Sequence, residues 1–404
     1  MKKTKIITPN GVKAEELLAL LGDSLLQDVA RELGSDKWVI KLKTVTVFKL
    51  VLYSLLDSER ISLRTMADQY LSVPFQTLEQ SVIGQTTAHS SIRDRLVNID
   101  VRFFERIYEQ SLTLLSAHYG SKQLSGGYNI KRYDSTMIAV FSHMLKGMAV
   151  GNTTRNKKQV KLTTELSEDF AVRMRFFNDQ DYLSEEVALK AMIQAQTHDS
   201  RSLIVFDRGL RSRQTFCELK EAKTQFVTRL NENTRYEVLR QHAEIPHKTV
   251  DGLRFIQDSI VNLYGDGRKL VDEEFRLIEV QVNKDGKKLI FLTNVLSLEA
   301  QQVAQVYRKR WDIEVFFRFL KQEMNLTHFV CNDLNAIQVM IYCILIAAML
   351  VLVYKKQNNI RSYKIAKMRF FKELQAAVTL ELIETPMGVE RLKLILKNQV
   401  NKSP

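Results

Sequence analysis

The chain has 404 residues, of which 45% are hydrophobic and 26% charged, a globular composition that excludes a largely disordered protein. This length predicts two or three domains. The net charge of +13, from 59 Lys and Arg against 46 Asp and Glu, favours a polyanionic partner such as nucleic acid, with a basic protein lacking such a partner as the alternative.

The three cysteines are far apart in the chain and form no CxxC pair: Cys217, Cys331 and Cys343. They argue against a disulfide framework and a zinc site, and they fit a reducing compartment. The basic N-terminal sequence MKKTKIITPNGVKAEELL lacks the apolar stretch of a signal peptide. We therefore expect a cytoplasmic protein.

Residues 1–125 are predicted to form an all-helical N-terminal domain. Apolar residues recur at helical spacing in 14–34 and in 45–59, and a polar link leads to a further helical pattern in 86–110. Arg93 and Arg95 on that last segment would suit a helix-turn-helix that contacts DNA. A plain helical bundle with basic exposed faces is the alternative.

Residues 126–230 are predicted to form an α/β sheet of mixed direction. β-Branched and aromatic residues follow a Gly-Gly break and predict a strand, and further strand and helix patterns alternate after it. The predicted strands are 126–141, 158–167, 171–180, 202–209 and 224–230, with helices at 184–196 and 211–223.

Residues 231–297 are predicted to form a β-rich insertion. Alternating segments such as FRLIEVQVN and KKLIFLTNVL are separated by glycine-containing turns at 264–267 and 285–286, which predict hairpins. The helical pattern returns in 298–355, the second part of the core. A helical, amphipathic and basic C-terminal region follows in 356–404.

One apolar run, 336–354, has 19 residues without a formal charge and is long enough to cross a bilayer. A buried central helix that is apolar on all sides has the same pattern. Because the run is single, contains Gln338 and has polar globular sequence on both sides, we favour the buried helix and expect no membrane association.

Three acids stand at unusual positions. Asp134 lies within a predicted strand, where Asp is depleted. Asp207 ends the buried strand LIVF, at the edge where α/β sheets place their sites. Glu314 lies in the segment YRKRWDIEVFFRFLK, which is predicted to be one helix. Each acid also has an ordinary explanation: a turn for Asp134, a helix cap for Asp207 and an ion pair for Glu314.

The predicted helix 307–321 carries Glu314 among basic and polar residues. On a single helix, an arc of about 80° would contain Tyr307, Arg310, Glu314, Arg318 and Lys321. The α/β order would bring the two strand-borne acids to one sheet edge, and the helix could supply Glu314. Three hard oxygen ligands without a His or Cys cluster suit Mg²⁺ or Mn²⁺, and the neighbouring bases would then bind phosphates.

These motifs resemble those of the DDE transposases of bacterial insertion sequences. The signature of the insertion-sequence-four type is Tyr, two residues, Arg, three residues, Glu, six residues and Lys. Tyr307, Arg310, Glu314 and Lys321 match it at these spacings.

The two aspartates also match motifs of this family. Asp134 is followed by Ser135 and Thr136, as in the first motif, and Asp207 is followed by Gly209 and later by an aromatic residue, as in the second. The resemblance covers roughly residues 126–355 and implies an RNase H-like mixed sheet flanked by helices. It also implies an insertion between the second Asp and the Glu.

The resemblance implies that Asp134, Asp207 and Glu314 hold two Mg²⁺ or Mn²⁺ ions and catalyse DNA strand cleavage and strand transfer at terminal inverted repeats. Tyr307, Arg310 and Lys321 would grip the transposon-end backbone, with further DNA contacts expected from Arg318 and from Arg208. The partners would be double-stranded DNA, both transposon ends and target, and a second copy of the chain in a synaptic complex.

Two other functions remain open from the sequence. A captured transposase could act as a DNA-binding regulator without catalysis, and a membrane-anchored protein could use residues 336–354. The cut-and-paste transposase, acting at the nucleoid in the bacterial cytoplasm, is the hypothesis that the acids and the bases favour together.

Overall fold

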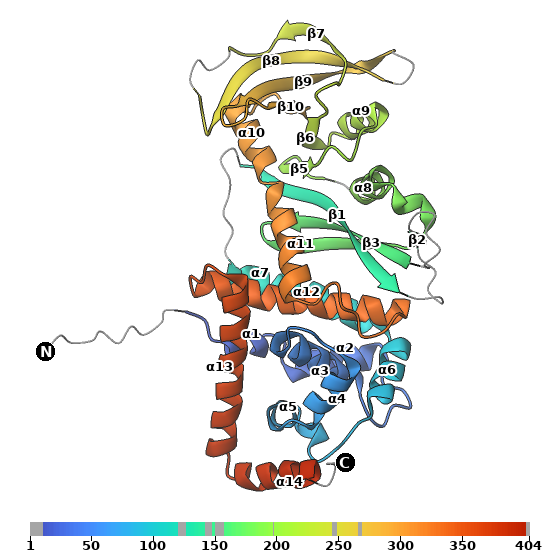
Figure 1. Cartoon of the computed structure of the whole chain (residues 1–404), viewed down its shortest axis with the longest axis vertical. Helices are drawn as coiled ribbons and strands as arrows, with labels where there is room; N and C mark the ends of the chain where they lie inside the picture. Colours follow the sequence, from blue (N-terminus) through green and yellow to red (C-terminus); the bar gives the residue numbers. More distant parts are fainter. Residues whose placement is uncertain are drawn as a thin grey trace, which may run out of the picture. The chain divides into compact units, whose positions relative to one another are not determined.

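The computed structural model describes residues 11–119, 127–141, 148–149, 157–196, 198–244, 249–265 and 269–400. Within them the fold is mixed α/β, with one large sheet and many helices, as predicted (Figure 1). The chain divides into two compact units. The helical unit comprises Met1–Gly120, Val140–Leu145 and Arg318–Pro404, and the sheet unit comprises Ser121–Ala139 and Lys146–Phe317.

Every regular element described in residues 11–119 is helical, and the C-terminal helices belong to the same unit. Short polar side chains begin several of these helices, since Ser62, Asp333 and Ser362 each accept a hydrogen bond from a backbone N–H three residues on. The predicted domain boundaries stay a prediction, and the one at 125/126 lies outside the described residues. The helices are α1 Ala14–Ala19, α2 Asp23–Glu32, α3 Thr44–Asp57, α4 Leu63–Leu71, α5 Val73–Leu78, α6 His89–Asn98, α7 Val101–Tyr119, α12 Leu334–Gln357, α13 Tyr363–Glu384 and α14 Gly388–Val400.

The apolar run 336–354 lies in α12, the central helix of the helical unit. α12 is long and apolar enough to cross a membrane, but 94% of its most apolar stretch is buried inside the protein. It packs against α3, α6, α7 and α13, which cover it from several sides. Burial among other helices explains why it is apolar on all sides, as the favoured interpretation predicted.

Arg95 does not face DNA as a helix-turn-helix would require. Its guanidinium donates to the Leu42 carbonyl at 3.0 Å and pairs with Asp36 at 2.9 Å, and its side chain is only 13% exposed. These contacts hold the loop before α3 in place. The expectation that Arg95 contacts DNA is therefore wrong. Arg93 is exposed and pairs with its neighbour Asp94.

The sheet unit is built on a continuous sheet of ten described strands, in the order β2–β3–β1–β5–β6–β10–β9–β8–β7, with β4 paired to β3. β1, β5 and β6 are parallel, whereas β6 and β10 are antiparallel. The strands are β1 Asn129–Phe141, β2 Met148–Ala149, β3 Lys157–Ser167, β4 Phe170–Phe177, β5 Ser202–Phe206, β6 Gln225–Leu230, β7 Tyr236–Gln241, β8 Leu253–Tyr264, β9 Leu270–Val282 and β10 Lys288–Thr293.

The predicted insertion 231–297 forms the antiparallel strands β7 to β10, and these extend the core sheet through the pairing of β10 with β6. The predicted β-rich segment is therefore continuous with the core sheet, and its bounds as an insertion stay a prediction. The turn expected at 264–267 lies partly outside the described residues. The pairing follows from β10, whose Ile290, Phe291 and Leu292 are buried and need cover on both faces.

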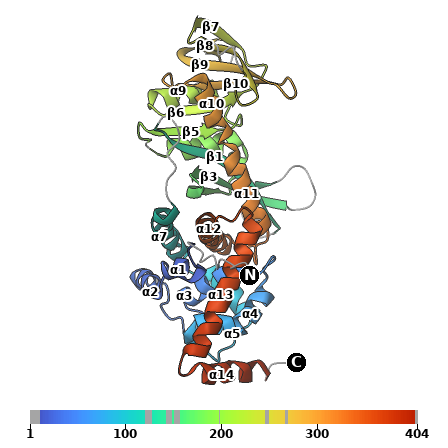
Figure 2. The same cartoon turned by 90° about the vertical axis from the view of Figure 1, so that its left-hand side faces the viewer.

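Helices cover both faces of this sheet (Figures 1 and 2). On one face α8, Glu185–Gln194, and α9, Arg213–Glu221, pack on a core that includes Tyr133, Phe206 and Phe226. On the other face α10, Ala300–Arg308, packs on a core that includes Val205 and Val227. The alternation of side chains along the strands thus sends neighbouring residues to opposite cores.

A buried ion pair joins β8 and β9. Arg276 donates from Nε and Nη2 to the two carboxylate oxygens of Asp258, at 2.9 and 2.7 Å, and the side chains are 1% and 3% exposed. Nη1 of Arg276 also donates to the carbonyl of Leu298, just before α10. This arginine therefore fastens the chain that leads into α10 to the antiparallel strands.

Candidate active site

The sheet register brings Asp134 and Asp207 together. Tyr133 on β1 is the partner of Phe206 on β5, and each aspartate directly follows one of these residues. Tyr133 and Phe206 point into the core under α8 and α9, so the two aspartates point to the opposite face, which α10 covers. Two half-buried carboxylates thus lie side by side, one on β1 and one directly after the adjacent strand β5, as the sequence predicts.

Backbone N–H groups hold both carboxylates in place. The N–H of Ser135 donates to Oδ1 of Asp134 at 2.7 Å, and the N–H of Gly209 donates to Oδ1 of Asp207 at 2.7 Å. A Cβ atom at Gly209 would lie 2.8 Å from this Asp207 oxygen and 2.9 Å from Cδ of Glu185. Gly209 is therefore needed for the close approach of the turn to two acids.

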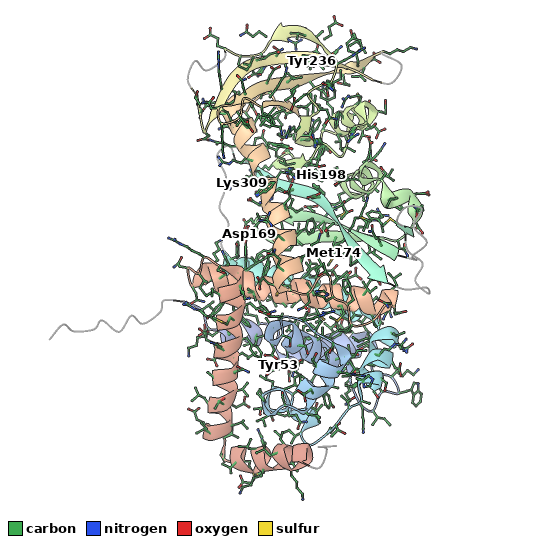
Figure 3. The ribbon with its side chains drawn as sticks, viewed as in Figure 1. Tyr53, Asp169, Met174, His198, Tyr236 and Lys309 are labelled. Carbon is green, nitrogen blue, oxygen red and sulfur yellow. The ribbon has the colours of Figure 1, made fainter. Side chains whose placement is uncertain are left out.

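Glu314 lies on α11, Trp311–Glu323, and not on one helix that runs from Tyr307 to Lys321. α10 ends at Arg308, and Lys309, labelled in Figure 3, forms a turn with Arg310. The N–H of Arg310 donates to the Tyr307 carbonyl at 3.0 Å and closes this turn. The prediction that five residues form one stripe on a single continuous helix is therefore wrong. Glu314, Arg318 and Lys321 still share α11, while Tyr307 belongs to α10.

Two ion pairs position the first turns of α11. Arg132 on β1, 5% exposed, pairs with Asp312 at 2.8 Å and so ties this helix to the strand that carries Asp134. Arg310 pairs with Glu314 at 2.6 Å across one helical turn. The charge of Arg310 also acts to lower the pKa of Asp134, so the guanidinium lies near two of the three predicted acids.

The acids repel one another in this site. Burial, opposed by the Ser135 hydrogen bond and reinforced by the charges of Asp207 and Glu185, raises the pKa of Asp134 to about 7. Glu185, a fourth acid that the sequence analysis missed, is the first residue of α8.

The donor set suits a divalent cation, because it consists of hard carboxylate oxygens with an excess of negative charge. Among the described residues, no three His, Cys, Asp or Glu side chains stand close enough to hold an ion as they are placed. Glu314 is turned to Arg310, so its carboxylate would have to leave that arginine to join the others.

Basic groups flank the acids. Arg229 on β6 lies two residues beyond Val227, the partner of Val205, and this register places it beside Asp207. Burial raises the pKa of Tyr307, and the charges of Arg310 and Arg229 oppose the rise. The Nε atoms of both arginines are buried and have no hydrogen-bond partner in the described part of the chain.

Arg229 was also missed, although a charge within the buried strand TQFVTRL is a signal that could have identified it. Of the other predicted DNA contacts, Arg208 is exposed directly after Asp207. Arg318 and Lys321 lie on the second half of α11, which belongs to the helical unit, and Arg318 is exposed. Their roles stay predictions.

Comparisons with known proteins agree on one class. Residues 134–350 match the family model described as Transposase DDE domain, which begins at Asp134 and includes Asp207 and Glu314. A putative transposase, y4zB, of Sinorhizobium fredii is 31% identical over 162 residues, 40% of this chain and 45% of its own length. A putative transposase for insertion sequence element IS4SA of Synechocystis is 22% identical over 82% of this chain and 88% of its own.

A cryo-EM structure of a piggyBac transposase synaptic complex with hairpin DNA has the same overall fold. The TM-score is 0.51 at 11% sequence identity, and the match covers 97% of this chain and 86% of the other. At this identity the likeness concerns the fold alone. The match spans less than half of the Sinorhizobium protein but most of the Synechocystis protein.

Proposed function

We propose, because this chain belongs to the Transposase DDE domain family, that it is an insertion-sequence transposase that cleaves and joins DNA at the terminal inverted repeats of its element. The observation that carries the proposal is the β1–β5 register, which sets Asp134 beside Asp207 within the family match. Glu314 is linked to this pair through Arg310. DNA, both transposon end and target, is the proposed substrate.

The proposed core is RNase H-like. The strand order β4–β3–β1–β5–β6 has β1 in the centre, with one acid on β1 and another directly after β5. Acids at the carboxyl end of adjacent parallel strands lie where α/β sheets place their sites. The helix that follows the antiparallel strands then supplies Glu314 on the face that the aspartates occupy.

Asp134, Asp207 and Glu314 are the proposed ligands of Mg²⁺ or Mn²⁺, two ions in all. Such ions, when bound, activate the attacking hydroxyl and stabilise the leaving oxygen of a phosphodiester. Arg310 keeps Glu314 close to the aspartates. Its unpaired Nε and that of Arg229 are donors suited to phosphate oxygens, and Tyr307 lies beside both.

A cleavage assay tests this function. The full chain should nick a duplex that carries the element's own terminal inverted repeats, only with Mg²⁺ or Mn²⁺ and at the repeat boundary. Asp207→Asn should bind this duplex but not cleave it. Specific binding without cleavage by the unaltered chain, under every divalent ion, would instead support the regulator without catalysis.

Salt dependence of end binding tests the basic groups. Arg229→Ala should weaken binding to the transposon end and lower the slope of log affinity against log salt by about one unit, since one phosphate contact is lost. Fluorescence anisotropy across a salt series measures the slope. Arg308→Ala is the matched control, because Arg308 carries the same charge and is exposed at the end of α10. Equal slopes for both variants would remove Arg229 from the DNA contacts.

The active complex is proposed to contain two copies of the chain, each binding one transposon end. The protein would act at the nucleoid in the bacterial cytoplasm. Both statements rest on the family alone and go with the proposed function.

A further inference from the structure

We propose that Glu185 is a fourth metal-binding carboxylate of this active site, in addition to Asp134, Asp207 and Glu314. The inference rests on the proposed function. It adds a ligand from α8, the helix on the opposite face of the sheet from α10. The acids would then reach the metal site from two strands and from helices on both faces.

The position of Glu185 follows from the course of the chain. Ser184 precedes α8, and Glu185 is its first residue, so its side chain stands at the end of the helix rather than along its packed face. Leu189, Met192 and Ile193 of α8 bury themselves in the core below. This packing fixes the N-terminal end of α8 at the sheet edge where β5 runs into Asp207.

Two contacts place the Glu185 carboxyl group among the aspartates. Its Cδ atom and the Oδ1 atom of Asp207 lie 2.9 and 2.8 Å from one point, the position that a Cβ atom of Gly209 would take. The Asp134 side chain also acts on the pKa of Glu185, and the charge of Glu185 raises the pKa of Asp134, so these two carboxyl groups lie close to each other as well. Two carboxyl groups in contact need a positive charge between them, either a shared proton or a cation. A divalent ion is the cation that this chemistry takes.

The charges of Lys161 and Arg310 act on Glu185, but each of these side chains has its close contact elsewhere, Arg310 with Glu314 and Lys161 with the Leu183 carbonyl. Among the described residues, no Lys or Arg nitrogen lies within 4.0 Å of its carboxylate. The ammonium group of Lys161 donates a hydrogen bond to the carbonyl of Leu183, at 2.6 Å. A residue that served only to stabilise the start of α8 would not need this position, because an acid anywhere in the first turn does so.

Glu186, the next residue, shows the difference. It lies in the same helical turn and carries the same charge, but its Oε1 accepts a hydrogen bond from the N–H of Ser212 at 2.6 Å. Glu186 therefore supports the start of α9, and Glu185 faces the catalytic acids. A Gln at position 186 can keep the bond to Ser212. Glu185→Gln and Glu186→Gln each remove one negative charge from the first turn of α8, so the second variant is the control for the first.

Mn²⁺ binding to the full chain, measured by isothermal titration calorimetry without DNA, tests the role of Glu185. Glu185→Gln should weaken Mn²⁺ affinity by about 10-fold or more, the size of effect seen when groups that support a metal site are removed. Glu186→Gln should leave the affinity unchanged. Cleavage by Glu185→Gln should need a correspondingly higher Mg²⁺ concentration.

Equal Mn²⁺ affinities for the two variants, with Asp207→Asn impaired, would overturn the role of Glu185 and leave the proposed function intact. If the unaltered chain binds no Mn²⁺ and cleaves no DNA, the proposed function itself fails. Should Glu185→Gln not fold, Glu185→Asp replaces it, because this change keeps the charge and shortens the reach by one methylene. The same loss of affinity is then expected, and an unchanged affinity would contradict the proposal.

Discussion

Replacing Glu314 by alanine is expected to lower metal-dependent cleavage by at least about 10³-fold. A metal ligand contributes several kcal/mol to stabilising the charge of the transition state, and each 1.36 kcal/mol is a factor of ten in rate. Binding to the transposon end should persist, because the change removes a negative charge beside Arg310 and leaves the arginine free for phosphate. The measurements are single-turnover cleavage and end binding on the same preparation.

Glu323→Gln is the matched control for this variant. Glu323 is the last residue of the same helix, α11, and removing its charge changes the helix without touching the aspartates. Its cleavage rate should stay within about threefold of the unaltered chain, a difference of less than 1 kcal/mol. Cleavage by Glu314→Ala at the rate of this control would show that Glu314 is not part of the site.

Replacing Arg276 by methionine is expected to destabilise the sheet unit by about 3–5 kcal/mol. The change leaves the carboxylate of Asp258 buried without its partner, which costs more than losing the pair as a whole. The carbonyl of Leu298 loses a donor as well. Urea unfolding reports the free energy, and the rate of thiol labelling at Cys217, which lies on the buried side of α9, reports opening of the sheet unit itself.

Two further variants separate charge burial from general disruption. Arg276→Met with Asp258→Leu should recover most of the lost stability, because no unpaired charge is left inside. Arg240→Ala breaks the exposed ion pair between Arg240 on β7 and Glu274 on β9 and should change the unfolding curve little. If Arg276→Met unfolds at the same urea concentration as Arg240→Ala, the buried pair does not hold these strands.

The strands that carry or precede the two aspartates could be predicted from sequence, because a strand is recognised from a few neighbouring residues. The apolar run before Asp207 and the β-branched residues around Asp134 define their strands, and the parallel order of the two strands leaves one edge for both acids. The prediction that 336–354 forms a buried helix was also correct, since a single apolar run between polar segments favours burial.

Other features depend on contacts that a local pattern does not contain. The turn at Lys309 and Arg310 has neither Gly nor Pro to mark it, so the helix was extended from Tyr307 to Lys321. Arg95 has the pattern of a surface arginine, and only the loop carbonyls around it show that it points inward. In the sequence, Glu185 looks like an ordinary acid in the first turn of a helix. Only its closeness to Gly209 and Asp207 in the structure distinguishes it from Glu186.

The pairing of β10 with β6 limits how relatives of this protein can differ. A segment between Leu230 and Ala300 must end in a strand that fits the edge of β6, or the sheet loses its hydrogen bonds at that point. Replacement is therefore easiest at β7, the outermost strand, because β8 supplies Asp258 to the buried pair with Arg276. Recombination between elements could exchange this outer strand without moving Asp134, Asp207 or Glu314.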